Sequence, residues 1–329
     1  MRTGRDAAAR AARRMAAEIT VLTRRAVEID PGAVLDRSQD MALATAGRVS
    51  PNGSCRLVRA TGGWIAVNLP REDDADLVPA WTGCAFSDPV WAAIESAALA
   101  EPAAAFVARG AELGLAVSLL GETAPEAGPR VSVLPGGSRK GGRRLRVLDL
   151  SALWAGPLCA GILAMAGHEV TKVESRTRPD PLARSAPAHD ARLNGLKRRL
   201  AVAFTRETLL PLMLEADVIV TSARPRAFAA LDLMPERLSA LKPHLIWVAI
   251  TAHGWDGTGA GRIGFGDDAA VAGGLVDWRD DEPAFAGDAL ADPLTGLAAA
   301  VAAREAIAGG DGAFIDAALA RTAADATGH

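Results

Sequence analysis

Residues 146–174 read RVLDLSALWAGPLCAGILAMAGHEVTKVE, and this stretch decides the fold. Residues 146–150 and 169–174 are short runs rich in Val and Leu, which is typical of buried strands. Residues 158–166 between them are apolar and follow Gly156-Pro157, and a proline suits the first turn of a helix. The stretch therefore predicts two strands joined by a helix.

The same alternation continues toward the C-terminus. It predicts strands at 200–204, 217–221 and 245–251, with helices near 207–215 and 235–241. Short apolar strands separated by helices indicate a parallel sheet that is covered on both faces. Such a sheet binds ligands outside the carboxyl ends of its strands. The ends that matter are residues 151–156, 175–178, 221–226 and 252–266.

The first half of the chain has a different pattern of predicted strands and helices. Two strands, at 55–60 and 64–69, are joined through Gly62-Gly63, and a last strand is expected at 115–119. Helices are expected between these strands, at 73–81, 89–100 and 103–113. The predicted class is α/β, with a Rossmann-like parallel-sheet domain at the C-terminus and a smaller α+β domain before it. The expected boundaries are a helical segment at 1–49, the small domain at 50–125, a Gly-, Pro- and Arg-rich linker at 126–144 and the Rossmann-like domain at 145–329.

Composition narrows the class of protein. Half of the 329 residues are hydrophobic, 23% are charged and the net charge is −3, which indicates a globular chain and argues against a nucleic-acid partner. Three scattered cysteines predict neither a disulfide framework nor a metal site, and they favour the reducing cytoplasm. Arginines among residues 2–25 lack a following apolar run, so a surface helix is expected there rather than a secretory signal. The uncharged run 150–167 meets the lower limit for a membrane span, but Gly and Pro interrupt it.

Generic motifs add little. Gly259, Gly261 and Gly264 fit the dinucleotide pattern G-x-G-x-x-G, but they lie eight residues beyond a strand and open no clear helix. P-loop, zincin and G-x-S-x-G patterns are absent from the sequence. His253, which follows a strand end, is the one histidine of the five in a plausible site.

A series of segments resembles the class III CoA-transferase family (CaiB/BaiF type), which includes formyl-CoA transferase, carnitine CoA-transferase and α-methylacyl-CoA racemase. The matching segments cover about 145–320 and are residues 147–157, 167–174, 193–198, 216–220, 224–225, 245–251, 262–265 and 287–296. Residues 50–59, 63–68, 88–91 and 113–117 resemble the small domain of that family, which typically follows the nucleotide-binding half. In this chain, the segments that resemble the small domain come before the nucleotide-binding half.

The resemblance implies an acyl-CoA:carboxylate CoA-transferase that takes acyl-CoA and carboxylic acid substrates. It places the nucleophile at Asp292, in the segment GDALADPLTG (287–296), and an active-site loop at Gly53. It implies a homodimer, with no metal, membrane or nucleic-acid partner. The residues that it implies for binding coenzyme A are Leu153, Trp154, Ala155, Arg176, Lys197, Ser222, Arg224 and Arg262.

Three alternatives stay open. A racemase of the same family would need a histidine where Phe265-Gly266 stands, unless Asp267, Asp268 or His253 replaces it. A non-catalytic CoA-binding subunit would fit the unusual domain order. Asp292 alone could be a helix N-cap before Pro293.

Overall fold

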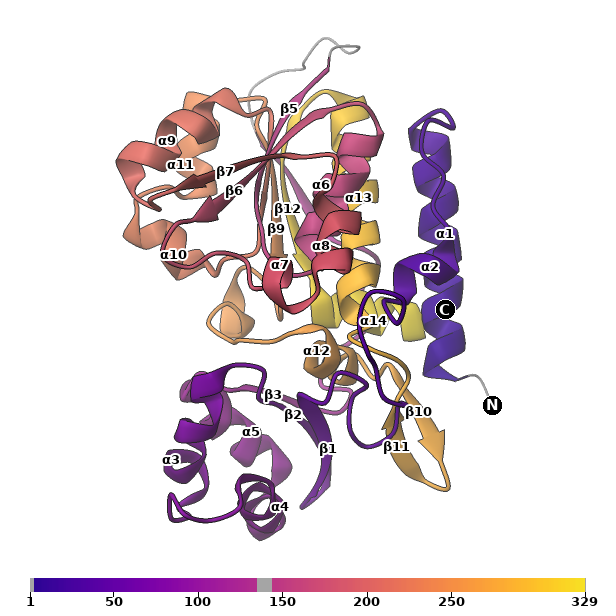
Figure 1. Ribbon diagram of the computed structural model, residues 1–329, viewed down its shortest axis with the longest axis vertical. Helices are drawn as coiled ribbons and strands as arrows, with labels where there is room; N and C mark the ends of the chain where they lie inside the picture. Colours follow the sequence, from indigo (N-terminus) through magenta and orange to yellow (C-terminus); the bar gives the residue numbers. More distant parts are fainter. Residues whose placement is uncertain (1–2, 135–143, 329) are drawn as a thin grey trace.

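A seven-stranded sheet forms the centre of the larger unit in the computed structural model, which describes residues 3–134 and 144–328 (Figure 1). Its strand order is β4-β12-β9-β8-β5-β6-β7, and all neighbours are parallel except β4 and β12. The six parallel strands have the order 3-2-1-4-5-6 of the doubly wound Rossmann fold, which confirms the predicted class. The strands are β4 (Arg130–Leu134), β5 (Arg146–Leu150), β6 (Glu169–Ser175), β7 (Arg198–Val202), β8 (Val218–Thr221), β9 (Ile246–Thr251) and β12 (Gly312–Ala318).

Helices cover both faces of this sheet. One face carries α9 (Arg206–Glu215), α10 (Pro225–Ala230) and α11 (Pro235–Leu241). The other carries α6 (Ala155–Met165), α7 (Leu182–Ser185), α8 (Pro187–Asn194), α13 (Ala291–Gly309) and α14 (Leu319–Thr327) (Figure 1). The helices α6 and α13 approach closely because α13 has a glycine at the crossing: a Cβ on Gly296 would lie 2.8 Å from Leu158.

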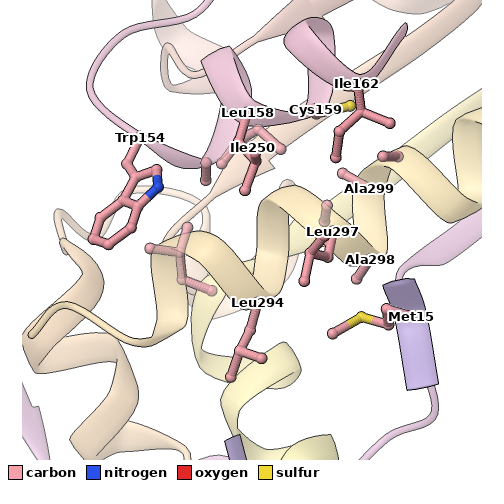
Figure 2. Close-up of a cluster of buried hydrophobic side chains, with 14 of the residues drawn as sticks. Met15, Trp154, Leu158, Cys159, Ile162, Ile250, Leu294, Leu297, Ala298 and Ala299 are labelled. Carbon is pink, nitrogen blue, oxygen red and sulfur yellow. The ribbon is translucent and has the colours of Figure 1, made fainter. Parts of the chain in front are cut away.

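The N-terminal helix belongs to the core of the larger unit. Helix α1 (Gly4–Leu22) packs along α13, and its Ala8, Ala12 and Ile19 are fully buried there. Figure 2 shows Met15 of α1 facing Leu297 and Ala298 of α13. The short helix α2 (Pro31–Leu35) follows and also contacts α13. The segment expected as a separate helical stretch is therefore a third layer over the sheet.

The smaller unit matches its predicted strands closely. Strands β1 (Cys55–Ala60), β2 (Gly63–Asn68) and β3 (Ala116–Leu119) form an antiparallel sheet. Gly62 has φ +89°, the left-handed conformation that the tight β1–β2 turn requires. Helices η1 (Glu72–Leu77), α3 (Val78–Thr82), α4 (Val90–Ala100) and α5 (Ala103–Glu112) cover one face, where Trp81 stacks on Phe106.

The other face of the small sheet joins the two units. It packs on α12 (Gly266–Ala272) and on the hairpin of β10 (Val276–Arg279) and β11 (Glu282–Phe285). Cys55, Leu57 and Trp64 meet Val271 and Phe285 in this contact. The short helix η2 (Gly257–Gly259) lies between β9 and α12. The packing brings the end of β2 to the beginning of α12.

One part of the expected linker differs from expectation. Residues 130–134 of the expected linker form β4, which pairs with β12 at the edge of the large sheet. Residues 135–143 of that linker lie outside the described residues. The run 150–167 is the end of β5, a turn and α6, as expected. Within the described parts of the chain, every helix is too short or too polar to span a bilayer.

Candidate functional site

Asp292 lies in the first turn of α13, the 19-residue helix at the centre of the molecule. The N-cap position is Leu290, two residues earlier, and Asp292 does not cap the helix. Its side chain is half-buried, and none of the described residues donates a hydrogen bond to its carboxylate. The N-terminus of a helix stabilises a negative charge, so the helix end acts against the burial that raises the pKa of this carboxyl.

The N-terminus of α12 passes directly against this carboxylate. A Cβ on Gly266 would lie 2.3 Å from Oδ2 of Asp292 and 2.5 Å from the carbonyl oxygen of Ala289. Only glycine fits at that point. The next two residues of α12, Asp267 and Asp268, are both buried.

The small unit supplies the amides that hold these acids. Asn52 Nδ2 donates to Asp267 Oδ2 at 2.6 Å and to Asp288 Oδ1 at 2.8 Å. Asn68, at the end of β2, donates to Asp268 Oδ1 at 2.8 Å. Asp268 Oδ2 is buried and has no hydrogen-bond partner among the described residues. Asp267, Asp268, Asp288 and Asp292 are called the carboxylate cluster below.

Arg37 is the cation of this cluster. Its Nε and Nη2 donate to the two carboxylate oxygens of Asp288, the latter bond at 3.2 Å. Its guanidinium carbon lies 4.8 Å from the ring centroid of Trp154, within the range of a cation–π contact. Arg37 comes from the segment after α2, so the N-terminal segment contributes directly to the site.

Burial, with a smaller contribution from neighbouring carboxylates, raises the pKa values of Asp267, Asp268 and Asp292. Burial raises the pKa of Asp292 to about 7; Arg37 lowers it, and the other three carboxylates of the cluster raise it. Burial and Asp288 raise the pKa of Asp267 to about 6. Burial raises the pKa of Asp268 to about 7, although the amide of Asn68 opposes the shift. Asp267, Asp268 and Asp292 therefore bind protons more tightly than ordinary aspartates, and their carboxylates are more basic.

The turn after β5 lies at the switch point of the sheet, beside the end of β8. The backbone N–H of Ala152 donates to Ser222 Oγ at 2.9 Å, which ties the two strand ends together. Leu153 has φ +67°, and its N–H donates to Asp180 at 3.1 Å. Trp154 and Ala155 follow as the buried start of α6. The structure thus brings four of the residues that sequence predicts for CoA binding to one edge.

Lys197 does not suit the role predicted from sequence. It is buried, and its Nζ donates to Asp149 Oδ2, the carbonyl of Pro157 and Asn194 Oδ1, at 2.7–2.8 Å. An ammonium group has three N–H donors, and all three are used. Lys197 therefore stabilises the turn after β5 and has no donor left for a phosphate.

A cleft between the two units contains a group of arginines. Its volume is about 380 Å³, and its charged lining residues are Arg71, Arg178, Arg224 and Arg226 together with Asp73, Asp74 and Glu112. Burial and the three neighbouring guanidinium groups lower the pKa of Arg224. Arg71 is held by Asp74 and by the carbonyl of Gly114. Four arginines facing one cleft constitute a site suited to phosphate groups.

The two other predicted arginines lie elsewhere. Arg176 is exposed at the end of β6, and its Nε donates to the carbonyl of Ala201 at 3.1 Å. Arg262 pairs with Glu122 at 2.6 Å and donates to the carbonyl of Val117 at 2.9 Å, so it connects the two units. Gly53 has φ +83° and sits next to Asn52 in the turn that reaches the cluster.

Sequence reasoning missed several residues of the site. Arg37, Asn68 and Asp288 reach the cluster through tertiary packing, and Arg226 reaches the cleft beside the predicted Arg224. Asn52 could have been found, because it neighbours the predicted Gly53. Among the described residues, no group of His, Cys, Asp and Glu is arranged to hold a metal ion.

Comparisons with known proteins agree with this architecture. The sequence model described as CoA-transferase family III matches residues 143–329. The succinyl-CoA:mesaconate CoA-transferase of Haloarcula hispanica is 32% identical over 205 residues, covering 53% of this chain and 50% of that protein. The succinyl-CoA–D-citramalate CoA-transferase of Chloroflexus aurantiacus is 29% identical over 191 residues, covering 52% and 47%.

A solved structure is also similar. A CaiB/BaiF family protein from Brucella suis has a TM-score of 0.51 and 30% identity, covering 57% of this chain and 55% of that one. The chain spans about half the length, or less, of the curated relatives that it matches.

Proposed function

Because this chain belongs to CoA-transferase family III, we propose that it exchanges coenzyme A between an acyl-CoA thioester and a free carboxylate, with Asp292 as the nucleophile. The observation that carries the proposal is the half-buried Asp292 carboxylate, which stands at a helix N-terminus without a hydrogen-bond donor. Its raised pKa supports the role, because a more basic carboxylate is a better nucleophile once it is ionised.

The first half of the reaction forms an enzyme thioester. A carboxylate oxygen of Asp292 attacks the thioester carbonyl, the C–S bond breaks, and a mixed anhydride and CoA thiolate result. The thiolate then attacks the aspartyl carbonyl. The donor leaves as its carboxylate, and coenzyme A remains bound to Asp292 as a thioester.

The second half reverses these steps with another acid. The carboxylate of the acceptor attacks the aspartyl thioester, which gives a second anhydride and CoA thiolate. The thiolate attacks the acyl carbonyl of the acceptor, so a new acyl-CoA leaves and the Asp292 carboxylate is restored. No net proton, water or electron is consumed.

The carboxylate cluster favours the covalent state. Ionised Asp292 is repelled by Asp267, Asp268 and Asp288, whereas an anhydride or thioester at the same position is neutral. Acylation therefore relieves a repulsion that the fold imposes. Correct orientation of the reacting groups contributes as well, since effective molarities on the order of 10⁵ M are reached in well-aligned reactions.

Binding of the CoA phosphates is assigned, as part of the proposal, to the arginine-lined cleft. Arg178, Arg224 and Arg226 supply guanidinium groups that suit phosphate oxygens. The turn 153–155 lies at the switch point, where doubly wound sheets bind nucleotides. A homodimer and a cytoplasmic location are further parts of the proposal; the unpaired cysteines Cys55, Cys84 and Cys159 suit a reducing compartment.

An exchange assay tests the proposal. The protein is incubated with succinyl-CoA, the donor named for both transferase relatives, and a panel of carboxylic acids, and new thioesters are read by mass spectrometry. We expect exchange in the wild type, none with Asp292→Asn, and normal exchange with Asp311→Asn, an exposed aspartate before β12. Deuterium incorporation at the α-carbon without exchange would indicate a racemase instead. Binding of CoA with neither reaction would indicate a non-catalytic subunit.

A further inference from the structure

The proposed reaction has an electrostatic problem. An acceptor acid is negatively charged, and it must approach a cluster that already holds four carboxyl groups. The carboxylates of the cluster repel a second carboxylate, and the repulsion is stronger in a buried site than in water. The acid therefore needs a cation inside the site, and Arg37 is the cation that acts on Asp292.

One edge of the Arg37 guanidinium is occupied and another is available. The Nε and Nη2 atoms donate to the two oxygens of Asp288. No described residue accepts a hydrogen bond from Nη1, and the Arg37 side chain is 14% exposed. An arginine has five N–H groups on a planar fork, so a second carboxylate can bind along Nη1 and Nη2.

The fork is held in place by its neighbours. Trp154 stacks against the guanidinium, and Asp288 is held by a further hydrogen bond from Asn52 Nδ2 to its Oδ1 at 2.8 Å. Burial of Asp288, at 7% exposure, strengthens the bidentate contact. A fixed fork loses little conformational entropy when it binds a second carboxylate.

We propose that the Nη1–Nη2 edge of Arg37 binds the carboxylate of the acid that accepts coenzyme A. This inference rests on the proposed transferase function and names the residue that recognises the acid. Arg37 thereby has two separable properties: a positive charge beside Asp292 and a two-pronged shape that fits a carboxylate.

Two substitutions separate these properties. Arg37→Lys keeps the charge but loses the planar fork, whereas Arg37→Gln loses both. Arg48→Gln is the matched control, because Arg48 is an exposed arginine of the same segment that also stacks on a tryptophan, 5.2 Å from the Trp64 ring centroid. Circular dichroism and thermal melting confirm folding, and Arg37→Lys decides the question alone if Arg37→Gln does not fold.

The probe is succinate, with the neutral diamide succinamide as a chemical control. Calorimetry measures succinate binding without turnover, and the transfer of isotope-labelled succinate into succinyl-CoA gives separate KM values for succinate and succinyl-CoA. Charge-assisted hydrogen bonds contribute about 1.5–3 kcal/mol, so we expect the succinate Kd and KM to rise about 10-fold in Arg37→Lys and about 100-fold in Arg37→Gln. The KM for succinyl-CoA and the properties of Arg48→Gln should stay within about threefold of the wild type.

The pH profile provides a readout that a purely structural role would not move. Arg37 lowers the pKa of Asp292, so the acid limb of the exchange rate should shift to higher pH in Arg37→Gln and stay in place in Arg37→Lys. Unchanged succinate binding in both variants would overturn the inference, as would equal binding of succinamide. The two proposals can fail separately. If the wild type shows no exchange but binds succinate, and Arg37→Gln loses that binding, then the role of Arg37 in binding the acid is supported and the transferase function is not.

Discussion

Replacing Asp268 with asparagine should stabilise the protein at both pH 5 and pH 8, and more strongly at pH 8. Asp268 is fully buried, its Oδ1 accepts from Asn68 and from the backbone of Phe265, and its Oδ2 has no partner among the described residues. Burial raises its pKa from the ordinary 3.8 to about 7. An asparagine keeps an oxygen for the two donors and carries no charge.

The magnitude follows from the pKa shift. The folded protein binds the Asp268 proton more tightly than the unfolded chain, so stability falls as pH rises from about 4 to about 7 and then levels off. Each pKa unit corresponds to about 1.4 kcal/mol, which gives a cost of about 4 kcal/mol at pH 8 and about 2 kcal/mol at pH 5. The asparagine variant avoids both costs, so its advantage should grow by about 2–3 kcal/mol between the two pH values.

Urea unfolding of the wild type and of Asp268→Asn at pH 5 and pH 8 measures this difference directly. Asp311→Asn, at an exposed position, should show no pH-dependent change. An advantage of Asp268→Asn that is equal at both pH values, or a loss of stability confined to pH 8, would refute the reasoning that Asp268 is ionised at a cost.

Three further predictions follow from the site. The exchange rate should rise with pH through about 7, because Asp292 reacts as a carboxylate; a pH–rate profile that is flat between pH 5 and 8 would contradict this. Lys197→Met should lower the free energy of unfolding by about 3–5 kcal/mol in urea titrations, because it leaves Asp149 buried without its counter-charge; a loss below about 1 kcal/mol would show that the pair is dispensable. The double variant Arg178→Gln/Arg226→Gln should weaken CoA binding about 10-fold or more by calorimetry, and an unchanged Kd would place the phosphates elsewhere.

The fold was largely predictable because its strands have clear sequence patterns. The parallel strands β5, β8 and β9 are buried on both faces and appear as short apolar runs between helices. The hairpin β10–β11 was missed because its turn, Asp280-Asp281, has φ +48° and +65° without a glycine to mark it. The strand β4 was missed because pairing with β12 gives order to a segment of linker-like composition.

The site was predictable only in part. The resemblance pointed to Asp292, which lies in the carboxylate cluster, and the doubly wound topology pointed to the turn at Trp154, which lies at the switch point; their roles are proposals. Arg37 could not be found, because neither spacing nor local pattern connects it with Asp288, 251 residues away. Lys197 was misassigned because the sequence does not reveal that Asp149, Pro157 and Asn194 take all of its donors.

The central claim is that Asp292 forms a covalent bond during the reaction, and trapping that bond tests it most directly. The protein is incubated with succinyl-CoA and quenched with hydroxylamine, and its peptides are analysed by mass spectrometry. The account predicts an aspartyl hydroxamate at Asp292 that is absent from Asp292→Asn. A hydroxamate at Asp288 or Asp267, or exchange that proceeds with no hydroxamate at any residue, would contradict it.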